Sequence, residues 1–188
     1  MRSSPFALLA VIALAATAFV SGCSTAPKSS DQSAFIAEAN AAKQYFLSHV
    51  PGLRQQIANS AGYVVYPSVG QWGIIFGGGK FGRGTVNLPG GTQVGWGAIN
   101  VASVGLQAGV QGFKMLVVFQ DKYTLEQFQQ NKLTGSAGGV IVVGETGDAG
   151  TASFTNGVAV YQGAQTGLMA GVNIALDYMR YKPLGESD

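Results

Sequence analysis

The chain has 188 residues, of which 47% are hydrophobic and only 11% are charged, and its formal net charge is +2. Its one cysteine, Cys23, excludes an internal disulfide, and its one histidine, His49, excludes a multi-histidine metal site. We therefore expect a single domain that is held together by its own apolar core.

The first 22 residues have the three parts of a secretory leader. Arg2 gives the positive start, residues 6–20 form an apolar run, and the Val-Ser-Gly-Cys sequence at 20–23 resembles the bacterial lipobox. The apolar run is too short and wrongly flanked to form a membrane-spanning helix. The sequence predicts a signal peptide at 1–22, which is removed, and a lipid on Cys23 that anchors the exported protein to a membrane.

Small and polar residues at 23–30 predict a tether between this lipid and the domain. The domain itself is expected to span 31–182, and residues 183–188 form a tail. Ser24 directly after the lipid-bearing cysteine favours sorting to the outer membrane of a Gram-negative bacterium, with the periplasmic or surface face left open.

Helical periodicity is confined to the start of the domain and to one later segment. Asp31 is placed as the N-cap of a first helix that ends near Ser48, because its apolar residues recur every three or four positions. Pro51 can begin a second short helix that runs to about residue 59. A third helix is expected at 124–132.

From Tyr63 onward the period of the apolar residues changes to two, which is typical of strands. Two segments, 114–119 and 140–143, are continuously apolar, as expected for strands covered on both faces. Turn signals occur at 89–91 and 147–150. The other expected strands are 63–67, 72–79, 82–88, 92–101, 103–111, 153–161 and 167–176.

Glycine is unusually frequent, with 28 residues, and the 25 between Gly62 and Gly171 are interleaved with apolar side chains. Rows of glycine on one face of a strand indicate tight bends or the close approach of another segment. The sequence predicts an α+β fold in which the N-terminal helices pack on the glycine face of a strongly curved, barrel-like antiparallel sheet.

The charge is unevenly distributed, because no acidic residue occurs between Glu38 and Asp121. Such asymmetry can mark an anionic partner such as a membrane surface. Dispersed cations are also common as ordinary solvated residues, and both interpretations stay open here. The acid-free stretch carries five basic residues, which are our candidates for contact with lipid head groups: Lys43, Arg54, Lys80, Arg83 and Lys114.

The residues needed for catalysis are missing. No Cys–His pair, nucleophile elbow or metal-binding set is present, so we expect no enzyme, no metal and no cofactor. A Gly-x-Gly-x-x-Gly pattern at 77–82 lacks the following helix and the later acid of a nucleotide site. We expect a flexible hairpin tip at 77–84 instead. The few, unclustered cations also argue against nucleic acid as a partner.

Four blocks in this order resemble the SYLF domain family: Ala61–Pro67, Gly73–Gly79, Ser103–Gly109 and Gly167–Val172. The resemblance implies a domain that binds membrane phospholipids. Eukaryotic members bind phosphoinositides through basic residues and an N-terminal amphipathic helix, and some bind actin. Bacterial members are exported lipoproteins, which this chain resembles more closely.

The leading hypothesis is a non-enzymatic lipoprotein that contacts the anionic head groups of membrane phospholipids. One alternative is a structural or interaction protein of the cell envelope whose sheet surface binds another protein, such as an envelope or host protein, or binds itself. A further alternative is a carrier of apolar ligands with a lumen inside the sheet.

Overall fold

The computed structural model describes residues 25–74, 77–103, 109–137, 140–144, 150–164 and 174–185. The leader and Cys23 lie outside these residues. So do parts of three expected strands, 72–79, 103–111 and 167–176, and most of the expected turn at 147–150.

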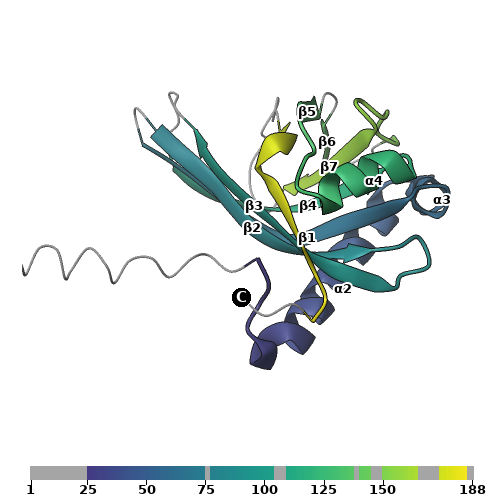
Figure 1. Cartoon of the computed structure of the whole chain (residues 1–188). Coiled ribbons are helices and arrows are strands. Elements are labelled where there is room, and N and C mark those ends of the chain that lie inside the picture. Colours follow the sequence, from purple (N-terminus) through teal and green to yellow (C-terminus); the bar gives the residue numbers. More distant parts are fainter. Residues whose placement is uncertain are drawn as a thin grey trace, which may run out of the picture.

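The N-terminal part of the domain is helical, as predicted (Figure 1). A 3₁₀ turn, η2 (Ser29–Asp31), leads into α2 (Gln32–His49), and α3 (Leu53–Ala58) follows. Asp31 is the N-cap residue of α2, but its side chain makes no capping hydrogen bond. Gly52 precedes α3 with a φ of +85°, so this helix begins two residues later than predicted from Pro51.

Four long antiparallel strands follow: β1 (Gly62–Ile74), β2 (Gly77–Asn87), β3 (Gln93–Ser103) and β4 (Gly109–Phe119). The expected break between strands 63–67 and 72–79 is wrong. β1 runs through this segment, and a bulge between Val65 and Ser68 absorbs the irregularity. The expected hairpin tip at 77–84 is also wrong, because residues 78–83 are paired on both sides within β2.

The remaining elements complete one mixed sheet. Its strand order is β6-β7-β4-β1-β2-β3-β9, and β6 pairs with β7 in parallel. The sheet is open, with β6 and β9 as its two edges, so the fully antiparallel, barrel-like sheet predicted from the sequence is wrong. The α+β class is confirmed. The later elements are α4 (Lys122–Gln129), β5 (Ser136–Ala137), β6 (Val140–Val143), β7 (Val158–Ala164), β8 (Ile174–Ala175), η3 (Leu176–Tyr178) and β9 (Met179–Pro183).

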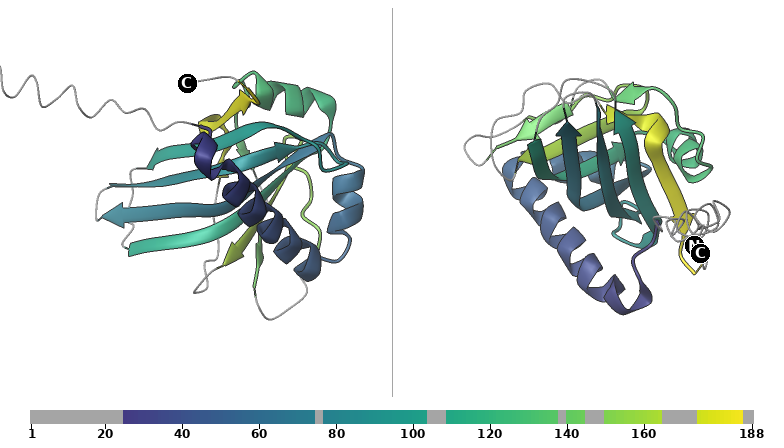
Figure 2. Two further views of the ribbon diagram at one scale, coloured as in Figure 1. Left: turned by 90° about the horizontal axis from the view of Figure 1, so that it is seen from below. Right: turned by 90° about the vertical axis from the view of Figure 1, so that its left-hand side faces the viewer.

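Helices cover both faces of the sheet, and each face has its own core cluster (Figure 2). On the α2 face, α2 and α3 bury Phe46, Leu53 and Ile57 against β1, β4 and β7. On the α4 face, Phe128 stacks on Phe119 at a centroid distance of 5.0 Å. This two-sided burial explains the continuous apolar run of β4.

The glycines of β2 and β3 serve a purpose other than the one predicted. A Cβ atom at Gly97 would lie 3.0 Å from the Tyr66 hydroxyl, and one at Gly95 would overlap the ring of Tyr181. Tyr66 belongs to the core of the α4 face, whereas the N-terminal helices pack on the other face. Gly95 and Gly97 therefore make room for tyrosine rings, whereas at Gly163 of β7 the Tyr45 ring of α2 takes the space, as predicted.

Tyr66 is buried, and its hydroxyl has no hydrogen-bond partner within the part of the chain that the structure describes. Burial also raises the pKa of this phenol. An unpaired buried hydroxyl costs about 1–3 kcal/mol. We therefore predict that Tyr66→Phe leaves the free energy of unfolding unchanged or raises it by about 1 kcal/mol, measured by urea denaturation.

Tyr161→Phe is the matched control for this substitution. The Tyr161 hydroxyl donates to Gln56 Oε1 and accepts the Ala152 N–H at 2.8 Å, so its loss should lower the free energy of unfolding by about 1–2 kcal/mol. Equal destabilisation by both substitutions would contradict our assignment of Tyr66 as unpaired.

Candidate functional site

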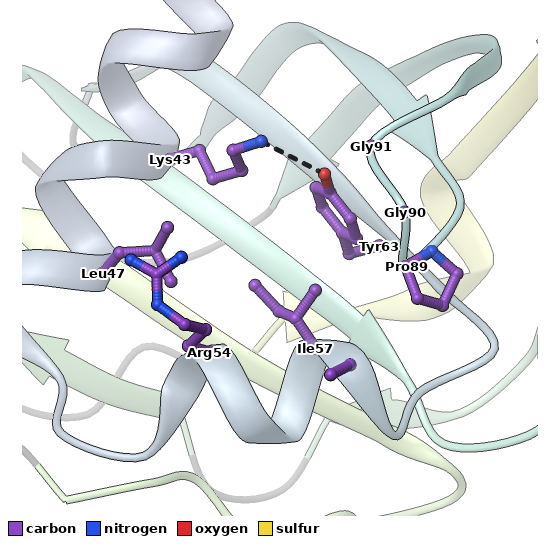
Figure 3. A pocket seen from close by; sticks show the side chains of 9 residues that line it. Lys43, Leu47, Arg54, Ile57, Tyr63, Pro89, Gly90 and Gly91 are labelled. Carbon is purple, nitrogen blue, oxygen red and sulfur yellow. Dashed lines mark hydrogen bonds between the residues drawn. The ribbon is translucent and has the colours of Figure 1, made fainter.

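A small pocket opens where α2, α3 and the β2–β3 turn meet (Figure 3). Its volume is about 180 Å³, which is smaller than the roughly 300–1,000 Å³ of pockets for drug-sized ligands. A single small polar group fits such a space. The residues that line it are Lys43, Leu47, Arg54, Ile57, Ala58, Tyr63, Pro89, Gly90 and Gly91.

Lys43 reaches the pocket because of its position on α2. Ala42 and Phe46 are buried against the sheet, which turns Lys43 and Leu47, four residues apart, toward the rim of the helix. The Lys43 ammonium donates to the Tyr63 hydroxyl at 3.4 Å and lies 5.7 Å from the centre of the Tyr63 ring. The buried tyrosine of β1 thus positions the ammonium at the pocket wall.

Arg54 comes from the first turn of α3, on the other side of the opening (Figure 3). Leu53 and Ile57 hold this short helix in the core, and Arg54 itself is exposed. None of the nine lining residues is acidic, so two cations face the pocket without a carboxylate among its walls. The site is therefore electrostatically suited to an anion.

The β2–β3 turn forms the third wall with its backbone. Gly91 N–H donates to the Leu88 carbonyl at 2.8 Å, and Leu88 N–H donates to the Thr92 carbonyl at 2.9 Å. Gly91 has a φ of +91°, and open space surrounds the Cβ positions of both Gly90 and Gly91. The turn leaves the pocket accessible because it carries no side chains at these two positions.

The other three cations predicted from the sequence lie elsewhere. Lys80 is half-buried on β2, and burial lowers the pKa of its ammonium. Arg83, three residues further along the same strand, lies on the opposite face. Lys114 lies on β4, and its ammonium is 5.2 Å from the centre of the Tyr45 ring of α2. The structure therefore brings together two of the five predicted residues.

The other parts of this pocket carry no functional signal in the sequence. Tyr63 was visible only as the start of a strand, and residues 89–91 only as a turn signal. Their role depends on β1 and the β2–β3 turn reaching α2 and α3, which no local sequence pattern reports.

The exposed side of α2 lacks the features of a membrane-binding helix. Its solvent-facing positions are small or polar and include Glu38, and its last turn carries only His49 as a basic residue. A membrane-surface helix needs a broad apolar face flanked by cations. The amphipathic helix implied by the family resemblance is therefore not present in α2, whose apolar residues face the sheet.

Within the described residues, no helix is long and apolar enough to cross a membrane. The same residues contain no group of three or more acidic, histidine or cysteine side chains that could hold a metal ion.

A scan of the chain against protein-family models found no match. A search of curated proteins also found no similar sequence. The interpretation of the pocket therefore depends on its own geometry.

The two glycines of the turn provide a test of its geometry. A side chain at Gly91 would be strained by the positive φ, so Gly91→Ala should lower the free energy of unfolding by about 1 kcal/mol or more. Gly90→Ala should change it by less than about 0.5 kcal/mol, because its Cβ would point into open space. Thermal denaturation of both variants checks this difference, and equal effects would contradict the turn conformation.

Proposed function

We propose that this protein is a membrane-anchored lipoprotein whose domain binds the anionic head groups of phospholipids at the Lys43–Arg54 pocket. The observation that carries the proposal is the convergence of two cations, from α2 and α3, on a small pocket without an acidic wall. A phosphate group matches this pocket in size and charge.

Three features of the sequence support the proposal. The lipobox-like sequence at 20–23 would place the domain beside a phospholipid surface. The resemblance to the SYLF family, in four ordered blocks between Ala61 and Val172, implies phospholipid binding. The acid-free stretch between Glu38 and Asp121 contains both pocket cations.

The expected strength of this interaction defines its role. Each cation near an anionic surface contributes on the order of 1 kcal/mol, and at 0.1 M salt the attraction is largely screened beyond about 10 Å. At physiological salt two such contributions alone are too weak to keep a soluble protein on a membrane, whereas a multi-chain lipid anchor holds stably; at low salt the same two charges suffice for measurable vesicle binding. The pocket would therefore orient an already anchored domain on its membrane.

The first test uses residues 24–188, which retain every described helix and strand. This lipid-free domain should sediment with vesicles that contain anionic phospholipid and should dissociate as salt rises. Lys43→Gln with Arg54→Gln should weaken binding by roughly 10- to 30-fold, because two attractive charges are lost.

The matched control is Arg83→Gln with Arg180→Gln, which changes the net charge equally. Both arginines are exposed, and they lie in register with Ala98 on β2 and β9, away from the β2–β3 turn. If this control weakens sedimentation as much as the pocket variant does, or if the unaltered domain fails to sediment at low salt, the proposal is wrong.

A separate test addresses the anchor. In the full-length chain, Cys23→Ser should move the protein from the membrane fraction to the soluble fraction and abolish the lipid-dependent mass increase of the mature protein. Lys43 and Arg54 are unchanged in this variant. Unchanged membrane partitioning would contradict the lipoprotein assignment.

A further inference from the structure

One end of the sheet exposes two large apolar side chains beside the pocket. β2 ends at Asn87, β3 begins at Gln93 and β9 ends at Pro183, so these termini share one end of the sheet. We call it the α3 end. Leu88 and Leu184 follow β2 and β9 directly, and they are 38% and 47% exposed.

The β2–β3 turn has a shape that suits entry into a lipid interface. Its two backbone hydrogen bonds, between Gly91 and Leu88 and between Leu88 and Thr92, close it into a tight loop. Pro89 cannot donate a backbone hydrogen bond. The turn is thus a narrow, uncharged tip with Leu88 as its exposed apolar residue.

The cations lie beside this tip. Pro89, Gly90 and Gly91 line the same pocket as Lys43 and Arg54 (Figure 3). An apolar tip next to cations is complementary to a bilayer, whose acyl chains lie beneath a layer of phosphates. This charge complementarity favours an anionic bilayer over a second protein as the occupant of the α3 end.

The N-terminal segment reaches the same region of the molecule. Phe35, in the first turns of α2, lies 6.1 Å from Trp96 near the start of β3. Gln32 donates to the Pro27 carbonyl at 3.3 Å, which ties the chain down ahead of α2. The four residue steps from Cys23 to Pro27 span at most about 14 Å. A lipid on Cys23 would therefore hold this side of the domain close to the bilayer.

We propose that Leu88 inserts into the acyl boundary of the bilayer while the pocket binds a head group, so that the domain stands with its α3 end on its own membrane. This inference rests on the proposed function, because the same pocket supplies the attraction. Phe81 is more exposed, at 56%, but its ring packs over Gly70 within the sheet. The inference therefore assigns no membrane contact to Phe81.

The absence of cysteine from residues 24–188 permits a direct test. Leu88→Cys in this domain is labelled with the polarity-sensitive fluorophore NBD and mixed with anionic vesicles. The emission should rise, and lipids carrying a spin label within the acyl chain should quench it. The same label at Phe81→Cys should respond to neither treatment.

A second pair of variants removes apolar surface without a label. Leu88→Ser should weaken sedimentation with anionic vesicles by roughly three- to tenfold, with the salt dependence retained. Phe81→Ser should leave sedimentation unchanged. Circular dichroism verifies that each variant is folded.

The outcomes separate this inference from the proposed function. If sedimentation requires Lys43 and Arg54 but Leu88→Ser binds normally and the label at position 88 remains in water, the insertion is overturned and head-group binding stands. If the domain binds no vesicles, both are overturned. A response at position 81 in place of position 88 would reverse the proposed orientation.

Discussion

The packing of α2 across the sheet is the constraint on which the rest of the structure depends. Ala39 and Ala42 let the helix approach β1 closely, and Phe46 is completely buried beneath it. This burial fixes the rotation of the helix and thereby directs Lys43 to its rim, where Tyr63 holds the ammonium. If α2 presented another side to the sheet, the Lys43 ammonium would be buried in the core or would point into solvent away from the pocket.

The same packing explains why an apolar, charge-poor chain can carry a polar site without catalytic groups. α3 is only six residues long, but Leu53 and Ile57 hold it in the core of the α2 face, so Arg54 has a defined position. The third wall, the β2–β3 turn, contributes backbone alone at Gly90 and Gly91. Binding of an anion here would use existing charges and would require no rearrangement of the described elements.

Much of the fold could be predicted from the sequence, since the helices and most strands follow from the spacing of apolar residues. The errors have physical causes. The strands expected at 63–67 and 72–79 left a gap at 68–71, but a bulge keeps β1 paired with both neighbours through this segment. The glycines of β2 and β3 suggested a covering helix, whereas rings such as that of Tyr66 fill the space. Lys43 and Arg54 line the same pocket only because of tertiary contacts, which the periodicity of the sequence does not encode.

The central claim is that the α3 end of the sheet meets an anionic bilayer. Hydrogen–deuterium exchange of the lipid-free domain, with and without anionic vesicles, tests this claim most directly. We expect protection of residues 40–59 and 87–93 that disappears at high salt, with residues 78–83 of β2, nearer the other end of the sheet, unaffected. Protection centred on residues 78–83, or no change in exchange at the α3 end, would show that the α3 end does not meet the bilayer.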